Sequence, residues 1–315
     1  MLGSDWTAVQ ERIRAALASD IDLLSSVNGS LLDNSGKQLR PMLCLLVAGA
    51  LGTVCEDSIG FAAASELLHN ATLLHDDVVD ESATRRGKPT LSALMGPTAA
   101  VLVGDYWLSK AVDTIVGTTR QDEVIPLFSR TLSNLSEGEM LQLEKASSAD
   151  TTEEDYLRIV YCKTASLFEA ACAAAAVSVD APEALREAAA RYGAAVGMAF
   201  QIKDDIFDYG DPSQIGKPVG SDLRERKITL PLLGALDNAP QQQARIRSLV
   251  ADIPDHPENC AEVHAFVLQN GGLDYAARRL DDFIGEALCA LEAFPPSERK
   301  EALAAFARYN AIRQS

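Results

Sequence analysis

The sequence predicts an all-α protein in which roughly 10–13 helices form a single domain, residues 1–315, around a central cavity. Nearly every segment repeats its apolar residues at the helical period, and no segment shows the period-two alternation of a strand. The chain is 47% hydrophobic and 23% charged, which suffices for a large core. No linker or low-complexity tract interrupts it. Gly193 and Gly197, four residues apart, would let a neighbouring helix approach closely.

The elements can be placed in chain order from apolar stripes, prolines and polar loops. An apolar stripe from Trp6 to Leu17 marks a first helix, and a loop rich in serine and asparagine is expected from Ser25 to Ser35. A second helix opens near Pro41, because proline suits a first helical position. Polar loops with glycine and proline cover residues 81–90 and 209–227. Further helices are expected over 57–80, 92–117, 121–147, 152–178, from Pro182 to about 208, from Thr229 onwards, and over 240–252, 258–270, 273–293 and 297–312.

Charge and cysteine usage exclude some classes of function. The net charge is −17, which makes nucleic acid a poor partner because phosphate binding needs a basic field. The six cysteines show no metal-ligand spacing and are expected to be small core residues in a reducing cytosol. No secretory signal opens the chain, and the longest uncharged apolar stretches are too short to span a bilayer. A soluble, cytoplasmic protein without stable membrane insertion is expected.

Two acidic clusters of the form DDxxD stand inside apolar runs: Asp76, Asp77 and Asp80, and then Asp204, Asp205 and Asp208. On a helix, residues four apart share a face, so the first and last aspartate of each cluster stack. Stacked like charges destabilise a helix, whereas a bound cation reverses the sign of that interaction. Carboxylate oxygens suit Mg²⁺, which binds one or two carboxylates together with substrate phosphates. The two clusters are therefore predicted to hold two or three Mg²⁺ ions.

Basic residues accompany the acidic clusters: Arg85, Arg86 and Lys88 after the first, Lys217, Arg224, Arg226 and Lys227 after the second, and Lys37 with Arg40 ahead of a helix. Carboxylates with Mg²⁺ and Lys/Arg clamps stabilise charge on a departing phosphate or diphosphate. The chain has no Walker-type or dinucleotide-binding glycine motif, so nucleotide phosphoryl transfer is not expected. His75 abuts the first cluster and is interpreted as a core or supporting residue rather than a metal ligand. A diphosphate ester with an apolar tail is the substrate that these features describe.

The order of these motifs resembles the trans-prenyltransferases, or polyprenyl diphosphate synthases, and in particular their long-chain, octaprenyl- and heptaprenyl-like members. The resemblance runs from about residue 30 to 235 and rests on Gly36-Lys37-x-Leu39-Arg40-Pro41, His69, Asp76-Asp77-x-x-Asp80 with Arg85-Arg86-Gly87, Gly104-Asp105, Lys163-Thr164, Phe200-Gln201-x-x-Asp204-Asp205-x-x-Asp208, Gly216-Lys217, Asp222-Leu223 and Lys227-x-Thr229-Leu230-Pro231. One position departs from the family pattern, because Arg226 stands where the family usually has glycine before the lysine. This residue adds charge and puts the placement of Lys227 in question.

The resemblance implies a Mg²⁺-dependent, head-to-tail condensation of an allylic diphosphate with isopentenyl diphosphate in a homodimer of isoprenoid-synthase fold. The released diphosphate would accept the proton, in keeping with the lack of an obvious protein base. The metal ligands implied are Asp76, Asp77, Asp80, Asp204, Asp205 and Asp208, and these six, with Lys163 and Lys217, are the catalytic residues. The allylic diphosphate would be bound by Arg85, Lys163, Thr164, Gln201, Lys217 and Lys227, and isopentenyl diphosphate by Lys37, Arg40, His69 and Arg86.

Product length would depend on the side chains that close the cavity below the first cluster. In the family, the fourth and fifth residues before the first aspartate set this floor, and here they are the small Thr72 and Ala71. A medium- or long-chain polyprenyl diphosphate is therefore expected. Trp107 on the next helix is an alternative floor.

Other readings stay open at this point. The chain could be a short-chain synthase that makes geranylgeranyl or farnesyl diphosphate. A class I terpene cyclase would typically carry a different second metal motif, and a non-catalytic subunit of a two-component synthase generally loses an aspartate cluster. The primer and the downstream pathway are not fixed by the sequence.

Overall fold

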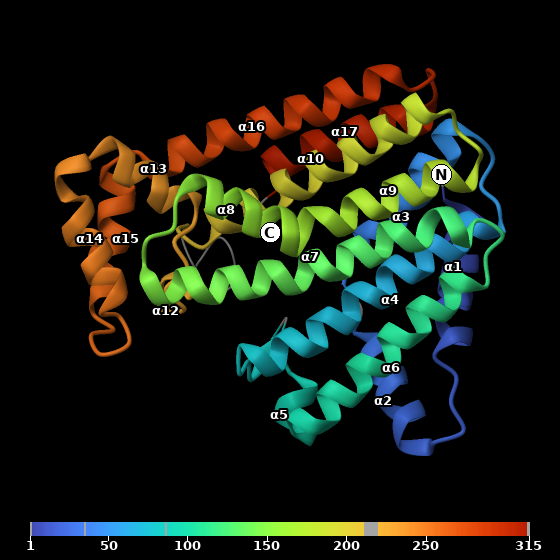
Figure 1. Cartoon of the computed structure of the whole chain (residues 1–315), viewed down its shortest axis with the longest axis horizontal. Helices are drawn as coiled ribbons and strands as arrows, with labels where there is room; N and C mark the ends of the chain where they lie inside the picture. The colour runs from blue at the N-terminus through green and yellow to red at the C-terminus, as the bar shows by residue number, and fades with distance from the viewer. Residues whose placement is uncertain (1, 35, 86, 211–219, 314–315) are drawn as a thin grey trace. The chain divides into compact units, whose positions relative to one another are not determined.

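The computed structural model describes residues 2–34, 36–85, 87–210 and 220–313 (Figure 1). The chain forms two compact units. Unit 1 comprises Met1–Phe128, Ala171–Glu187 and Pro295–Lys300, and unit 2 comprises Ser129–Ala170, Ala188–Phe294 and Glu301–Ser315. Helices account for nearly all regular structure in the described ranges, which confirms the all-α prediction. The single domain and its central cavity stay predictions.

Unit 1 is built around the long helix α4, which packs against α1, α3, α5 and α6. Small and apolar residues cover most of α4, and Phe61, Leu67 and Leu68 are fully buried on it. The elements that begin in unit 1 are α1 (Gly3–Ala16), α2 (Asp22–Asp33), α3 (Leu39–Leu51), α4 (Glu56–Val79), β1 (Thr84–Arg85), β2 (Lys88–Pro89), α5 (Leu91–Met95), α6 (Pro97–Val116), α7 (Gln121–Ser148) and α10 (Glu183–Phe207), with α17 (Glu298–Ile312) further on.

The loop predicted from Ser25 to Ser35 is wrong, because this segment lies largely in helix α2. Its exposed side is rich in serine and asparagine, and this composition suggested a loop. One polar residue, Asn28, instead faces the core, where it donates to Leu17 O (2.9 Å) and accepts from Trp107 Nε1 (2.9 Å). Because both hydrogen bonds of this amide are made inside the protein, a polar residue can lie on the buried face of the helix. Hydropathy alone does not show such a position.

Two long helices of the prediction are interrupted in the structure. The helix expected over 92–117 breaks into α5 and α6 at Gly96, whose φ of 85° favours glycine, and Pro97 then opens α6. The helix expected over 152–178 consists of α8 (Glu153–Val160), the π-helical turn η1 (Tyr161–Ala165) and α9 (Ser166–Ser178). The second interruption contains Lys163 and Thr164, both predicted site residues.

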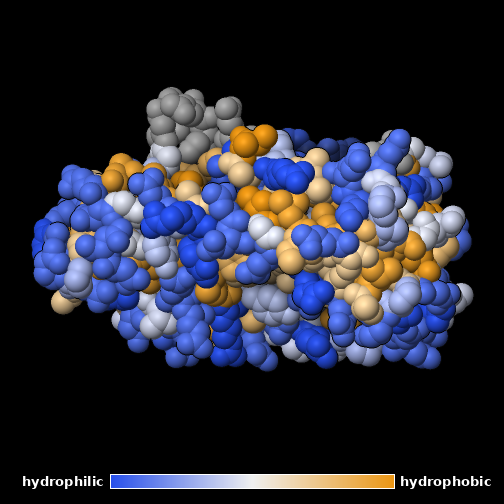
Figure 2. All heavy atoms as spheres, turned by 90° about the horizontal axis from the view of Figure 1, so that it is seen from above, coloured by the Kyte–Doolittle hydropathy of each residue, from blue (hydrophilic) through white to orange (hydrophobic). Residues whose placement is uncertain are grey.

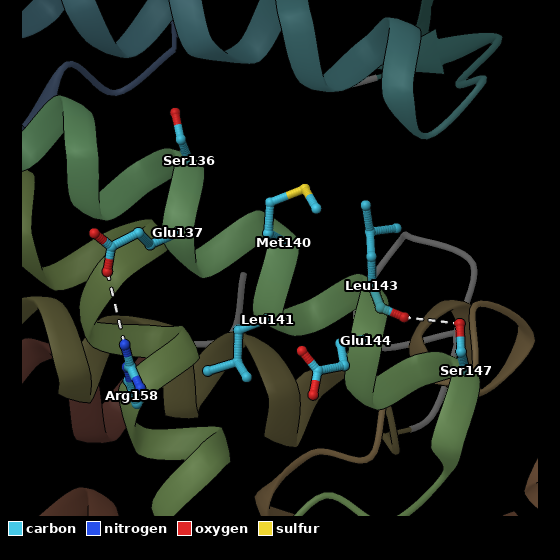
Figure 3. A pocket seen from close by; sticks show the side chains of 8 residues that line it. All are labelled: Ser136, Glu137, Met140, Leu141, Leu143, Glu144, Ser147 and Arg158. Atoms are coloured by element: carbon cyan, nitrogen blue, oxygen red, sulfur yellow. Dashed lines mark hydrogen bonds and ion pairs between the residues drawn. The ribbon is translucent and has the colours of Figure 1, made fainter.

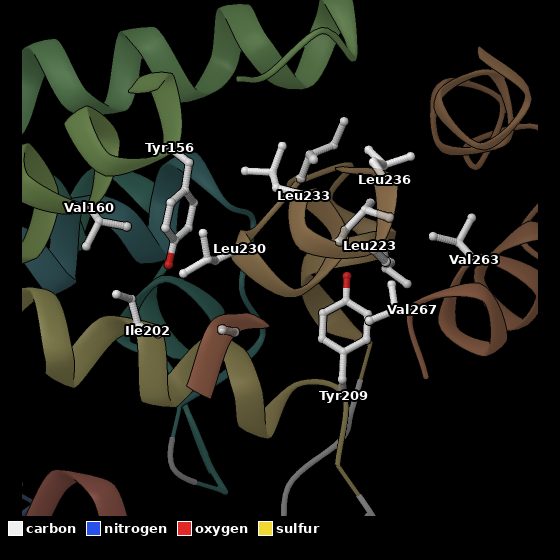
Figure 4. Close-up of a cluster of buried hydrophobic side chains, with 14 of the residues drawn as sticks. Tyr156, Val160, Ile202, Tyr209, Leu223, Leu230, Leu233, Leu236, Val263 and Val267 are labelled. Atoms are coloured by element: carbon white, nitrogen blue, oxygen red, sulfur yellow. The ribbon is translucent and has the colours of Figure 1, made fainter. Parts of the chain in front are cut away.

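Unit 2 has a core of side chains from α8, α10 and α13 to α16 (Figure 4). Helix α13 packs against α15 and α16, and Leu230, Leu232 and Leu236 of α13 are buried. The remaining elements are α12 (Ser221–Arg224), α13 (Leu230–Asn238), η2 (Pro240–Gln242), α14 (Gln243–Ala251), α15 (Asn259–Gln269), α16 (Gly272–Ala290) and η3 (Leu291–Ala293).

The predicted close approach at Gly193 and Gly197 is confirmed. A Cβ on Gly193 would lie 2.5 Å from Phe168 O, and a Cβ on Gly197 would lie 2.5 Å from Ala165 Cα. Both distances are far inside van der Waals contact, so only glycine lets α10 lie this close to η1 and the start of α9. The backbone that carries Lys163 and Thr164 is thereby held against the helix that carries the second aspartate cluster.

The cysteine prediction is borne out at half of the positions. Cys44, Cys162 and Cys172 are buried, Cys260 is half-buried, and Cys55 and Cys289 are exposed. All six are free thiols.

One stretch of the described chain, Glu153–Ser178, is long and apolar enough to cross a membrane. Uncharged apolar stretches alone, on which the sequence prediction was based, are too short to do so. Since 72% of the apolar window of Glu153–Ser178 is buried within the protein, this segment has the character of a core helix. The surface in Figure 2 is largely hydrophilic with apolar areas between. Exposed apolar side chains of the described residues include Leu94, Met95 and Leu102 on α5 and α6.

Candidate active site

The first aspartate cluster lies in the last turn of α4. Asp80 is the C-cap and Glu81 adopts a left-handed conformation with a φ of 48°. The Glu81 amide donates to Val78 O (3.3 Å) and the Ser82 amide to Asp77 O (3.1 Å). This pair of bonds is a Schellman motif, which ends the helix and turns the chain away. The carboxyl end of a helix carries partial negative charge, so the cluster lies where a cation is favoured.

The three aspartates of this cluster differ in burial. Asp77 is buried, and its Oδ1 accepts from Arg85 Nε at 2.8 Å. The hairpin of β1 and β2, which pairs Arg85 with Lys88, turns the chain so that Arg85 lies over the end of α4. Burial raises the pKa of Asp77, and the charge and hydrogen bond of Arg85 oppose the shift. Asp76 is half-buried and Asp80 is exposed, so this stacked pair presents the more accessible carboxylates.

The side chain of His75 contacts helix α6, as expected for a supporting residue. Its Nε2 lies 3.3 Å from Asp105 Oδ1 and 3.3 Å from Val101 O, both on α6. A Cβ on Gly104 would lie 2.3 Å from the same nitrogen. The Gly104-Asp105 pair therefore admits and orients this imidazole.

The second cluster lies in the last turn of α10 and shows the same division. Asp205 is buried, its Oδ2 accepts from Tyr156 Oη at 2.6 Å, and its Oδ1 accepts from Gln201 Nε2 at 2.8 Å. Figure 4 shows Tyr156 reaching from α8 among apolar side chains. Burial raises the pKa of Asp205 to about 7, the two hydrogen bonds lower it, and the charges of Asp204 and Asp208 raise it.

Asp208 caps the segment that follows. Its Oδ1 accepts from the amide and hydroxyl of Ser221, at 3.0 and 2.8 Å, and its Oδ2 accepts from the Asp222 amide at 3.0 Å. Both oxygens are thus engaged in holding the start of α12. Asp204, with a side chain 38% exposed, forms an ion pair through its Oδ1 with Arg313 Nη2 at 2.8 Å. Its other oxygen, Oδ2, has no hydrogen bond or ion pair with a described residue.

The π-helical turn η1 connects a threonine to the second cluster and directs a lysine towards α7. Thr164 Oγ1 donates to Gln201 Oε1 (2.9 Å), and Gln201 in turn donates to Asp205. Lys163 Nζ forms an ion pair with Glu139 and donates to Gln142 Oε1 (3.0 Å). π-Helical turns recur at functional sites because the extra residue re-aims side chains. The turn directs Lys163 towards α7 while Thr164 faces α10.

The departure at Arg226 has a structural explanation. Arg226 has a φ of 57°. Its amide donates to Leu223 O (2.9 Å), and the Lys227 amide donates to Asp222 O (2.7 Å), which is a second Schellman motif, at the end of α12. The left-handed position of this motif favours glycine, and arginine adopts it here at a cost. Lys227 therefore keeps a defined backbone position, and its side chain pairs with Glu225.

The basic residues predicted for isopentenyl diphosphate lie in unit 1. Lys37 is exposed, His69 is half-buried on α4, and Arg40 is buried at the start of α3. Burial lowers the pKa of Arg40 to about 10, and the charge of the buried Glu66 opposes the shift. Arg86 and Lys217, also predicted to bind substrate, lie outside the described residues.

The residues predicted to set product length occupy α4 and α6. Ala71 is buried and Thr72 is half-buried, one turn before Asp76. Trp107 is buried and bonded to Asn28, so its indole packs in the core of unit 1. A role for these three side chains in product length stays a prediction.

The aspartates suit a hard cation that brings further oxygen ligands. Within the described residues, no three His, Cys, Asp or Glu side chains form a complete metal site. One or two carboxylates per cluster, with waters and phosphate oxygens, is the coordination that Mg²⁺ prefers. A separate open groove of about 680 Å³ between α7 and α8, lined by residues such as Met140, Leu143 and Arg158, contains none of the predicted site residues (Figure 3).

Two residues of this site were missed by sequence reasoning. Tyr156 and Arg313 contact Asp205 and Asp204, but each belongs to a distant helix or chain end. No motif marks either residue in the sequence.

An all-α chain with two aspartate clusters at helix ends, the first supported by an arginine and the second by arginine, tyrosine and glutamine side chains, has the architecture of a prenyltransferase. The family model of the polyprenyl synthetases matches residues 21–267, and the chain belongs to this family. It is thus a transferase of prenyl groups, of the trans-polyprenyl diphosphate synthase class.

Several relatives are named for nonaprenyl or octaprenyl products, and one is named a short chain isoprenyl diphosphate synthase. The chain is 41% identical to an all-trans-nonaprenyl-diphosphate synthase (geranyl-diphosphate specific) of Rhodobacter capsulatus, over 96% of this chain and 93% of the relative. It is 38% identical to an octaprenyl diphosphate synthase of Haemophilus influenzae, over 96% and 92%. The crystal structure of a polyprenyl synthase from Caulobacter crescentus, complexed with calcium and isoprenyl diphosphate, superposes with a TM-score of 0.91 at 33% identity and covers 100% of this chain and 96% of that one.

Proposed function

We propose that the protein elongates an allylic diphosphate with isopentenyl diphosphate, head to tail and with Mg²⁺, to a medium- or long-chain polyprenyl diphosphate. The observation that carries this proposal is the shared design of the two aspartate clusters. Each lies at the carboxyl end of a long helix, and each has its second aspartate buried and hydrogen-bonded while the first is more accessible. This design supports cation binding at both.

Different side chains would bind the metal and the two substrates. Asp76, Asp80 and Asp204 would hold Mg²⁺, since the oxygens of Asp205 and Asp208 are occupied by neutral donors and Asp77 is held by Arg85. Bound Mg²⁺ would supply Lewis-acid stabilisation of the departing diphosphate. The allylic diphosphate would be bound by the guanidinium, ammonium and side-chain polar groups of Arg85, Lys163, Thr164, Gln201, Lys217 and Lys227, and isopentenyl diphosphate by Lys37, Arg40, His69 and Arg86.

Two lysines that would bind the diphosphate form ion pairs with glutamates in the structure. Lys163 pairs with Glu139, and Lys227 pairs with Glu225. A diphosphate that attracts Lys227 must compete with Glu225, which is 45% exposed and therefore weakly paired, whereas Lys163 must leave Glu139, which is only 18% exposed. In exchange, phosphate offers either lysine charge-assisted hydrogen bonds.

Product length is expected to follow the small residues on α4. Ala71 is buried one turn below the first cluster, so a phenylalanine there would fill space that a growing chain needs. The names of the relatives support a long product. The short-chain alternative is not favoured.

Radiolabelled isopentenyl diphosphate, an allylic primer and Mg²⁺ should yield an organic-soluble product, resolved by reversed-phase chromatography. Product should be absent with a chelator and return with excess Mg²⁺. The Ala71→Phe variant should make shorter products at a similar rate of isopentenyl consumption, with Ala62→Phe on the same helix as a control for general disruption. A predominantly fifteen-carbon wild-type product would refute the deep cavity, and no incorporation would refute the proposed function.

We further propose that the protein acts in the cytoplasm as a homodimer, as the family resemblance implies. Mass measurement by light scattering would test the oligomeric state.

A further inference from the structure

The C-terminal end of α17 is joined to the second aspartate cluster through a buried arginine. Arg313, which follows the last residue of α17, is 6% exposed. Its Nη2 forms an ion pair with Asp204 Oδ1 (2.8 Å) and donates to Phe200 O (2.7 Å). Its guanidinium carbon lies 4.2 Å from the centre of the Phe200 ring and 5.2 Å from that of Phe207.

The position of α17 does not depend on this arginine alone. Lys203 Nζ donates to Ala311 O (2.9 Å), as lysines commonly do at helix ends. Further back, Tyr192 Oη donates to Leu303 O (2.9 Å), and Leu303 and Ala307 are buried. The helix is therefore anchored on α10 by contacts that do not touch Asp204.

The ion pair of Arg313 is weak evidence for a role in stability. A buried charge loses hydration, and one carboxylate partner seldom returns more than that loss. Its Nε, also buried, has no hydrogen-bond partner among the described residues. What the contact does fix is the rotamer of Asp204, because Oδ1 is held and Oδ2 is left without a described partner.

We propose that Arg313 is a positioning residue for Asp204, which it orients so that Oδ2 is presented to a divalent cation. This inference rests on the proposed function only in taking Asp204 as a metal ligand. Partners that orient a ligating carboxylate typically change metal affinity or activity by about 10–100-fold when removed.

The direction in which Mg²⁺ affinity changes when Arg313 is replaced distinguishes a positioning role from simple charge balance. If Arg313 only offset negative charge, its removal would leave a more acidic cluster, and divalent cations would bind more tightly. Positioning predicts weaker binding. Arg313→Met retains packing over Phe200 and removes the donor, and should raise the dissociation constant for Mg²⁺ by about tenfold or more. Arg313→Lys restores a donor and should recover part of the affinity.

The experiment measures Mg²⁺ binding to the full chain by calorimetry in the presence of inorganic diphosphate, together with the Mg²⁺ dependence of the rate. The matched control is Lys203→Met, which removes the neighbouring cation that holds the end of α17 and should lower the melting temperature while Mg²⁺ binding stays unchanged or becomes tighter. An Arg313→Met curve that is unchanged, shifted to tighter binding, or shifted as much as that of Lys203→Met overturns the proposal.

A double variant keeps the test valid if Arg313→Met weakens the fold. With Asp204→Asn in place, Arg313→Met should have no additional effect on Mg²⁺ affinity, and additive losses would overturn the proposal. Wild-type protein that binds Mg²⁺ yet makes no prenyl product would count against the proposed function and leave this inference standing.

Discussion

The hydrogen bond from Tyr156 to Asp205 predicts a pH-dependent loss of stability in Tyr156→Phe. The substitution removes the hydroxyl donor 2.6 Å from a buried carboxyl whose pKa is raised to about 7. A hydrogen bond to an ionised group contributes about 1.5–3 kcal/mol, and a neutral one about 0.5–1.5 kcal/mol. The cost of the substitution should therefore grow by about 1–2 kcal/mol as Asp205 ionises.

The sign follows from proton linkage. The pKa of Asp205 lies above its ordinary value of 3.8, so the folded protein binds more protons than the unfolded chain between about pH 4 and 7. This group therefore makes the wild type less stable as pH rises through that window. Without the tyrosine donor the pKa of Asp205 rises further, by about one unit for each 1.36 kcal/mol, and the loss of stability continues to higher pH.

The assay is urea denaturation of the metal-free protein at about pH 5.5 and about pH 9, with a chelator present throughout. Tyr161→Phe is the matched control, because it removes a hydroxyl that donates to the partly exposed Glu169 at 2.8 Å, away from the aspartates. Its cost should be similar at the two pH values. An equal cost of Tyr156→Phe at both would refute the conclusion that this hydroxyl stabilises an ionising Asp205.

Three further predictions concern the backbone and the metal. Arg226→Gly should stabilise the protein by about 0.5–1 kcal/mol in urea denaturation. The left-handed conformation strains arginine by slightly more free energy than the conformational entropy of glycine costs on folding. A clear destabilisation would contradict the Schellman assignment. Gly193→Ala should destabilise the protein by about 1–3 kcal/mol, because the new Cβ would meet Phe168 O. Its control, Gly285→Ala, lies in open space on α16 and should stabilise the protein by up to about 1 kcal/mol. Equal effects of the two substitutions would contradict the close helix approach. Mg²⁺ with inorganic diphosphate should raise the melting temperature, and Asp76→Asn should abolish most of that increase, whereas a full increase in the variant would exclude Asp76 as a ligand.

Local chemistry made much of this site predictable from the sequence. The DDxxD spacing places the first and last aspartate of each cluster on one helix face, and apolar neighbours indicate that the clusters border a core. The unusual residue before Lys227 was also visible in the sequence. Its meaning required backbone angles, because only the φ of 57° shows why glycine is favoured there.

What escaped prediction depends on contacts between residues distant in the chain. The sequence assigned all six aspartates to metal without distinguishing them, yet Arg85 engages Asp77 only because a hairpin turns the chain back. Asn28 was taken for a loop residue, since nothing local announces that its amide bonds a tryptophan of another helix. Burial of polar groups is decided by such partners, and hydropathy patterns do not record them.

The repeated design of the two clusters has a physical reason. Three carboxylates in one helical turn repel each other, and the negative end of the helix dipole adds to the cost. Burying the second aspartate against a donor removes one carboxylate from solvent and ties the turn to the core, through Arg85 at Asp77 and through Tyr156 and Gln201 at Asp205. The carboxylates of Asp76, Asp80 and Asp204 then lie on fixed turns, so a divalent cation would meet oxygens that are already oriented. Rigid, mutually repelling carboxylates gain more from cation binding than mobile ones do, since little conformational freedom is left to lose.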